Sequence, residues 1–219
     1  MLNDYLATFI TPERRERMRT VLALRQRYIT VVLEDIFQPH NASAVLRSCD
    51  AFGVQDVHII ENRNTCRITP DVELGSAQWL SIRKYKEKKN NTVQALKTLK
   101  TRGYRLAAAS LQAKQSLEEL TLERGPLALL FGTEMTGLSQ PALDAADETF
   151  SIPMRGFIES FNISVAAAIT LYSLTKRLQA SHIEWELSHG EKEDIRTQWL
   201  RSSIKKSDIL VKEFFERYA

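Results

Sequence analysis

Apolar residues are arranged along this chain in two patterns, one typical of helices and one typical of buried strands. Apolar positions that return every three or four residues predict helices at 12–26, 41–52, 92–101, 140–146 and 163–178. Short apolar or β-branched runs predict strands at 29–33, 54–60, 104–109, 127–131 and 149–152. The pattern therefore predicts strands that alternate with helices through most of the chain.

Such alternation is typical of an α/β domain with a mostly parallel sheet flanked by helices. We expect this domain at 28–180, after a basic helical extension at 1–27 and before a helical extension at 181–219. Apolar residues at partly helical spacing, among them Trp199 and Phe214, favour one or two helices in the last segment, packed on the body or on a second subunit.

Composition narrows the class of protein. The chain has 219 residues, of which 43% are apolar and 26% charged, which excludes collagen-like and wholly disordered proteins. No run reaches the roughly 18 apolar residues of a membrane helix, and the first residues lack the order of a signal peptide. Cys49 and Cys66 have neither metal nor redox spacing, so we expect a reducing, cytoplasmic location.

Charge is informative by position rather than by sum, since the total is 30 − 27 = +3. One basic cluster consists of Arg14, Arg15, Arg17 and Arg19. A second, from Arg83 to Arg102, has eight Lys/Arg against the single acid Glu87. Two local patches favour a polyanion partner. A solvated helical surface is an equally good interpretation of the charges alone.

Three segments follow predicted strands, where parallel α/β sheets bind ligands. The first segment, 40–47, contains Asn41 and Arg47; capping and a surface ion pair are the plainer interpretations of these residues. The second, 129–137, is bounded by Gly132 and Gly137. It mimics a phosphate loop without the required lysine, and a plain strand-to-helix turn is the alternative.

The third segment, 152–165, leaves a strand at a proline and carries Ser160 and Asn162 where a helix begins. The exposed N–H groups of a helix start suit a polar or anionic ligand. Capping alone is the alternative, because Ser and Asn are usual capping residues.

The order of these segments is specific. They read QPHNASAVLRSCDAFGV, LLFGTEMTGLS and IPMRGFIESFNISVAAAITLY, and they closely resemble the three motifs of the SpoU branch of the SPOUT methyltransferases. The resemblance is strongest to the TrmH subgroup, the tRNA guanosine-18 2′-O-methyltransferases. It covers about residues 20–180 and includes the GSAQW segment that begins at Gly75.

The resemblance implies a carboxyl-terminal deep trefoil knot, a homodimer packed through knot helices, and bound S-adenosylmethionine. The knot could not have been derived from the hydrophobic pattern, because a topology in which the chain threads through a loop is very rare in proteins. The residues that the resemblance places in the cofactor loops are Ala109, Leu130, Gly132, Glu134, Gly137, Ile152, Met154, Ser160 and Phe161.

The resemblance also implies the catalytic residues. Arg47 corresponds to the family's catalytic arginine, which helps to activate the ribose 2′-hydroxyl; because a guanidinium is a poor base, it needs a phosphate oxygen or a polarised neighbour. Asn41 would hold Arg47 or the ribose, while Glu134, Ser160 and Asn162 would shape the loops and position the nucleotide. Methyl transfer from a sulfonium needs no metal, and none is expected.

The implied partner is tRNA or another structured RNA, bound through both basic clusters. The expected RNA contacts are Arg14, Arg15, Arg17, Arg19, Arg25, Arg83, Lys84, Lys86, Lys88 and Lys89. About 27 residues precede the first strand, too few for the separate RNA-binding domain of some ribosomal RNA methyltransferases, which favours tRNA. Gln38, where the family often has a basic residue, departs from the pattern.

Three alternatives stay open at this point. The chain could methylate ribosomal RNA or another tRNA position. It could be a non-catalytic RNA-binding module, which would bind no cofactor. It could also be a nucleotide-dependent enzyme that uses the loop from Gly132 to Gly137, although the missing lysine counts against this.

Overall fold

A computed structural model of the chain describes residues 1–88 and 90–218. The chain divides into two compact units, which we call the sheet unit (Arg27–Trp185) and the helical unit (Met1–Gln26 with Glu186–Ala219). Each is described by itself.

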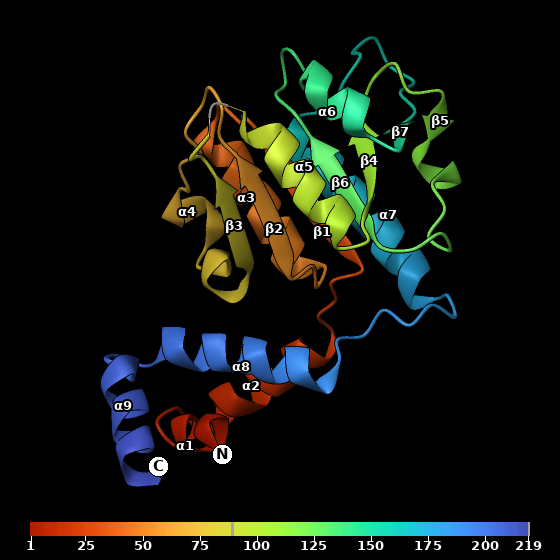
Figure 1. Cartoon of the computed structure of the whole chain (residues 1–219). Coiled ribbons are helices and arrows are strands. Elements are labelled where there is room, and N and C mark those ends of the chain that lie inside the picture. The colour runs from red at the N-terminus through yellow and green to blue at the C-terminus, as the bar shows by residue number, and fades with distance from the viewer. Residues whose placement is uncertain (89, 219) are drawn as a thin grey trace. The chain divides into compact units, whose positions relative to one another are not determined.

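The sheet unit is built on seven parallel strands in the order β3-β2-β1-β6-β4-β7-β5 (Figure 1). The strands are β1 (Ile29–Glu34), β2 (Asp56–Ile60), β3 (Ser81–Tyr85), β4 (Arg105–Ala109), β5 (Gln115–Ser116), β6 (Leu127–Phe131) and β7 (Glu148–Ser151). Every residue of the central strands β1 and β6 is buried, because helices cover both faces of a parallel sheet.

Alternate residues of the central strands enter two separate cores. Leu33 and Leu129 pack on one face with α3 (Pro39–Ala51) and α7 (Ile163–Gln179). Val32 and Leu130 pack on the other face with α5 (Asn91–Thr101) and α6 (Gln140–Ala145). The short helices α4 (Pro70–Glu73), η1 (Ser76–Trp79) and η2 (Leu117–Glu119) lie in the connections. The predicted α/β fold, a mostly parallel sheet flanked by helices, is confirmed.

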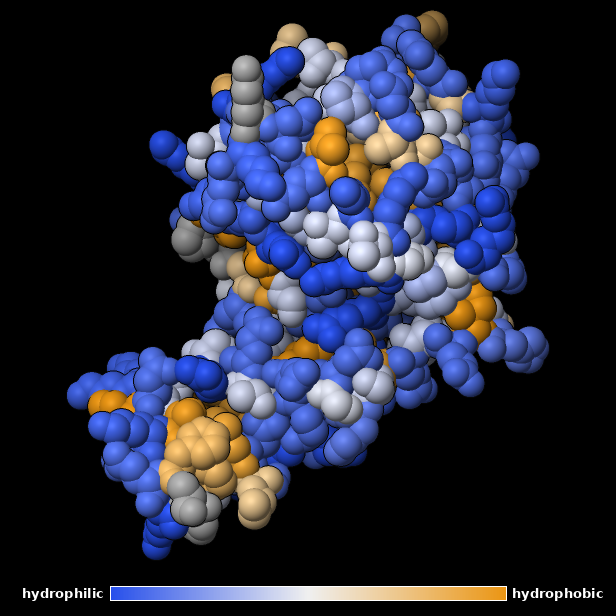
Figure 2. Space-filling model, viewed as in Figure 1, coloured by the Kyte–Doolittle hydropathy of each residue, from blue (hydrophilic) through white to orange (hydrophobic). Residues whose placement is uncertain are grey.

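The helical unit joins the two ends of the chain. Its helices are α1 (Leu2–Ala7), α2 (Pro12–Ala23), α8 (His189–Ser203) and α9 (Ser207–Tyr218). Asn3 on α1 donates to the Glu193 carbonyl oxygen (3.0 Å) and accepts from Thr197 (2.7 Å), both on α8. Apolar side chains stay exposed around α9, including Phe9, Ile209 and Phe215 (Figure 2). The two predicted extensions are thus one packed unit.

Candidate active site

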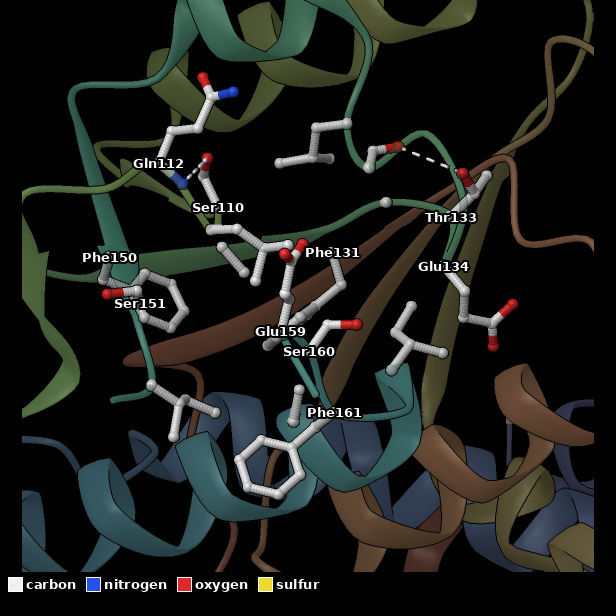
Figure 3. A pocket seen from close by; sticks show the side chains of 18 of the residues that line it. Ser110, Gln112, Phe131, Thr133, Glu134, Phe150, Ser151, Glu159, Ser160 and Phe161 are labelled. Atoms are coloured by element: carbon white, nitrogen blue, oxygen red, sulfur yellow. Dashed lines mark hydrogen bonds between the residues drawn. The ribbon is translucent and has the colours of Figure 1, made fainter. Parts of the chain in front are cut away.

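A cavity of about 340 Å³ lies at the carboxyl ends of β4, β6 and β7. The loops that follow these strands form its walls, and α7 adds one side. Figure 3 shows the Glu159 and Ser160 side chains in the middle of this region, near Phe131. Phe150 lies on one side of them and the turn at Thr133 on the other. A cavity at strand ends is where a parallel sheet is expected to bind its ligand.

The turn between Gly132 and Gly137 is closed on itself. The N–H of Thr133 donates to the Gly137 carbonyl, and the N–H of Gly137 donates to the Thr133 carbonyl, both at 3.0 Å. A Cβ on Gly132 would lie 2.2 Å from the Gly137 backbone, so only glycine fits there. The N–H groups of Thr133, Thr136 and Gly137 are used within the turn, and Leu138 follows Gly137 where a phosphate-binding loop has its lysine. The turn therefore lacks the features of a phosphate-binding loop.

The end of this loop is fastened to the centre of the sheet. The buried carboxylate of Glu34, the last residue of β1, accepts from the N–H (2.8 Å) and hydroxyl (2.7 Å) of Ser139, the residue that caps α6. Thr92 on α5 donates to the same carboxylate at 2.5 Å. Glu34 was not predicted as a site residue. The sequence does contain a signal for it, because an acidic residue ends an otherwise apolar predicted strand.

Three polar residues, one from each of the three motifs, meet beside the cavity. The Asn41 amide donates to the Glu134 carboxylate, and the Asn162 amide donates to the Asn41 side-chain oxygen at 3.0 Å. Asn41 is buried, and Glu134 also lines the cavity. The structure therefore joins segments that are 93 and 121 residues apart in the sequence.

Asn41 was expected to cap a helix, and that interpretation is wrong. The residue that caps α3 is Gln38, so Asn41 lies within the first turn, where its side chain faces the cluster. Asn162 does cap α7, since its side-chain oxygen accepts the N–H of Ser164 at 2.8 Å. Asn162 therefore both caps a helix and belongs to the three-residue cluster, whereas Asn41 belongs to the cluster alone.

The expected cofactor-loop residues lie around the cavity, with one exception. The lining includes Ala109, Gly132, Glu134, Gly137, Ile152, Met154, Ser160 and Phe161. Leu130 does not line it, because alternation along β6 turns its side chain into the core on the opposite face of the sheet.

Arg47 lies on α3 outside this cavity. Its side chain is exposed, and in the described part of the chain no carboxylate or hydrogen-bond acceptor contacts its guanidinium. Asn41 and Arg47 are six residues apart, about 120° around the helix, so they occupy different faces. The structure places Arg47 where a large ligand such as RNA has access.

The expected RNA contacts differ in their availability. Arg25 was expected to contact RNA, but its side chain is only 1% exposed. Its guanidinium lies 5.2 Å from the Trp199 ring centroid within the helical unit. Lys84 contacts Glu61 and the Cys66 carbonyl. The remaining described side chains are exposed, and Lys89 lies outside the described residues. The exposed ones are Arg14, Arg15, Arg17, Arg19, Arg83, Lys86 and Lys88.

The described residues hold neither a candidate metal site nor a helix that could cross a membrane. Residues 1–88 and 90–218 contain no group of three or more His, Cys, Asp or Glu side chains that could hold a metal ion. Within the same residues, no helix has the length and apolar character needed to cross a membrane.

Comparisons with known proteins agree with this geometry. The model of the SpoU rRNA methylase family matches residues 28–172. A tRNA (guanosine(18)-2′-O)-methyltransferase from Borreliella burgdorferi is 47% identical over 201 residues, which are 91% of this chain and 90% of that protein. Its namesake from Thermus thermophilus is 37% identical over 172 residues, 78% of this chain and 86% of that protein.

A solved structure resembles most of the chain as well. The crystal structure of the Aquifex aeolicus TrmH/SpoU tRNA modifying enzyme superposes with a TM-score of 0.78 at 30% sequence identity. The match covers 89% of this chain and 98% of that one. It therefore extends beyond the sheet unit into the terminal helices.

Proposed function

The chain belongs to the SpoU rRNA methylase family, and from this premise we propose that it methylates the ribose 2′-hydroxyl of guanosine 18 in tRNA, with S-adenosylmethionine as the methyl donor. The observation that carries the proposal is the meeting of Asn41, Glu134 and Asn162 beside the strand-end cavity. Relatives that carry this activity in their names match 91% and 78% of the chain, which favours tRNA over ribosomal RNA.

The cavity fits the proposed cofactor. Its apolar walls, among them Phe131, Phe150 and Ile152, suit a nucleoside, while Glu134 and Glu159 provide negative charge for a cation. When bound, S-adenosylmethionine supplies an electrophilic methyl carbon on a sulfonium that leaves as a neutral thioether. The binding-module alternative gives no reason for a cavity of this composition.

The chain's own residues prepare the ribose for the reaction. The guanidinium of Arg47 stabilises negative charge that develops on the 2′-oxygen. The 2′-oxygen bonds to the methyl carbon as the carbon–sulfur bond breaks, and its proton passes to a phosphate oxygen of the RNA or to a neighbouring polar group. The Asn41–Glu134–Asn162 cluster fixes the loops, and Ser160, which lines the cavity, helps to position the nucleotide.

We propose that the active form is a homodimer packed through α7. This helix leaves Val165 and Tyr172 43% and 55% exposed on one side, and a second copy of the chain would bury them. Family members combine residues of two subunits at one site, which fits the position of Arg47 outside the cavity. Sedimentation equilibrium is expected to give twice the chain mass of 25.1 kDa; a monomer would contradict the proposal.

The decisive experiment uses methyl-labelled S-adenosylmethionine with unmodified tRNA, followed by digestion to nucleosides. Labelled 2′-O-methylguanosine that maps to position 18 is the expected result. Label on another ribose, or on ribosomal RNA alone, would retain the chemistry and reject the target. No transfer to any RNA would reject the enzyme and favour the binding-module alternative.

A further inference from the structure

One buried hydroxyl at the cavity has no partner. Helix α7 presents Ile163, Ala166 and Thr170 to the cavity, a spacing of three and then four residues that places them on one helix face. The Thr170 side chain is 0% exposed, and its hydroxyl oxygen makes no hydrogen bond to any described residue.

This arrangement is unusual for a helical threonine. Buried polar atoms nearly always have a hydrogen-bond partner, and a threonine in a helix usually donates to the carbonyl one turn earlier. Valine has almost the same shape and would occupy the position without the cost of an unpaired hydroxyl. A ligand in the cavity would remove that cost.

We propose that the Thr170 hydroxyl hydrogen-bonds the adenosine part of the methyl donor, an inference that rests on the proposed function. The cavity wall includes the apolar residues Phe150, Ile152 and Ala166, and a flat heterocycle with polar edge atoms matches an apolar wall that has one hydroxyl. The positively charged sulfonium and α-ammonium groups match the carboxylates of Glu134 and Glu159 on the loops. Thr170 is therefore a cofactor-binding residue on α7, within the third motif but after its loop.

The test is Thr170→Val, with S-adenosylhomocysteine binding measured by calorimetry. Loss of one hydrogen bond predicts a Kd about 3- to 10-fold higher. Thr170→Ser keeps a hydroxyl and is expected to restore most of the affinity. Thr175→Val is the matched control, because Thr175 has a second buried, unpartnered hydroxyl on α7 that does not line the cavity.

Ligand-free thermal unfolding separates binding from folding. Both valine variants are expected to unfold at or above the wild-type temperature, since each removes an unpaired buried hydroxyl. An affinity loss in Thr170→Val alone supports the proposal. Unchanged affinity in Thr170→Val, or an equal loss in Thr175→Val, overturns it.

A smaller ligand locates the contact. Methylthioadenosine keeps the adenosine and the sulfur but lacks the amino-acid end, so Thr170→Val should weaken it by the same factor as S-adenosylhomocysteine. A loss restricted to S-adenosylhomocysteine would overturn the assignment to adenosine. If the wild-type protein binds neither ligand, the proposed function fails together with this inference, a result distinct from equal binding by wild type and variant.

Discussion

At the scale of single residues, Arg47 is an exposed cation, and its guanidinium makes no hydrogen bond or ion pair with any described residue. Because it lies outside the cavity, Arg47→Ala is expected to leave S-adenosylhomocysteine affinity unchanged while methyl transfer falls at least about 100-fold. Arg47→Lys keeps the charge without the planar fork and should recover only part of the activity. Single-turnover transfer and calorimetry measure the two quantities, and full activity in Arg47→Ala would refute the catalytic role.

His58 is a buried histidine on β2, shortly after the end of the first motif at Val54. It is 2% exposed and its Nδ1 lies 3.0 Å from the Tyr85 hydroxyl. Burial lowers the pKa of His58 from 6.5 to about 4, and the nearby Arg102 and Arg83 charges add to the effect. The unfolded chain therefore binds a proton that the folded chain rejects between these values.

Stability from neutral His58 is fully present above about pH 6.5 and decreases as the pH falls towards 4. Urea unfolding should give a free energy about 2 kcal/mol lower at about pH 5 than at about pH 7 from this residue. The double variant His58→Phe, Tyr85→Phe removes the titrating ring and its hydroxyl partner together, so its pH dependence should be smaller by that amount. An unchanged pH dependence would contradict the assignment.

Residue roles were only partly accessible from the sequence. Asn41 illustrates why: asparagine at a predicted helix start is a normal cap, and it lies inside the helix because α3 begins two residues earlier, at Pro39. Arg25 shows the same limit, because its charge was visible in the sequence but its burial depends on Trp199, 174 positions away (199 − 25). Long-range partners decide such cases.

At the scale of elements, the Gly132–Gly137 turn offers a sharp test. Gly132→Ala places a Cβ 2.2 Å from the Gly137 backbone, so the turn must open. We expect at least a 10-fold loss of S-adenosylhomocysteine affinity with little change in far-UV circular dichroism. Gly156→Ala is the matched control in the neighbouring loop, since its Cβ would contact nothing within 4 Å. Equal affinities in both variants would contradict the role of the turn.

Elements with a strong apolar signal were predictable, and the others were not. Strands β1, β2, β4, β6 and β7 and helices α2, α3, α5, α6 and α7 all coincide with predicted segments. Strand β3 was missed because it is an edge strand whose Arg83 and Lys84 face solvent, so its pattern is one of charge. Strand β5 has two residues, too few for any periodic signal.

At the scale of the whole molecule, RNA affinity should depend on charge in the helical unit. Arg15 and Arg17 on α2 are exposed, so their joint replacement by alanine is expected to weaken tRNA binding and reduce the salt dependence of log Kd by up to about 2. S-adenosylhomocysteine affinity should stay the same. Arg19→Ala is expected to weaken tRNA binding less, because Arg19 already forms an ion pair with Glu16 at 2.6 Å. An unchanged salt dependence in the double variant would exclude this helix from the RNA surface.

The helical unit also constrains the order in which the protein takes shape on the ribosome. Met18, Leu22 and Arg25 are buried in a unit whose other half includes α8, more than 160 positions later. At about 5–20 residues per second, α2 waits on the order of ten to thirty seconds for that partner. All residues of the sheet unit are made before residue 186, so α2 leaves the ribosome well before the helix on which its buried side chains pack. Until α8 is made, these side chains lack their partner and are open to chaperones and proteases.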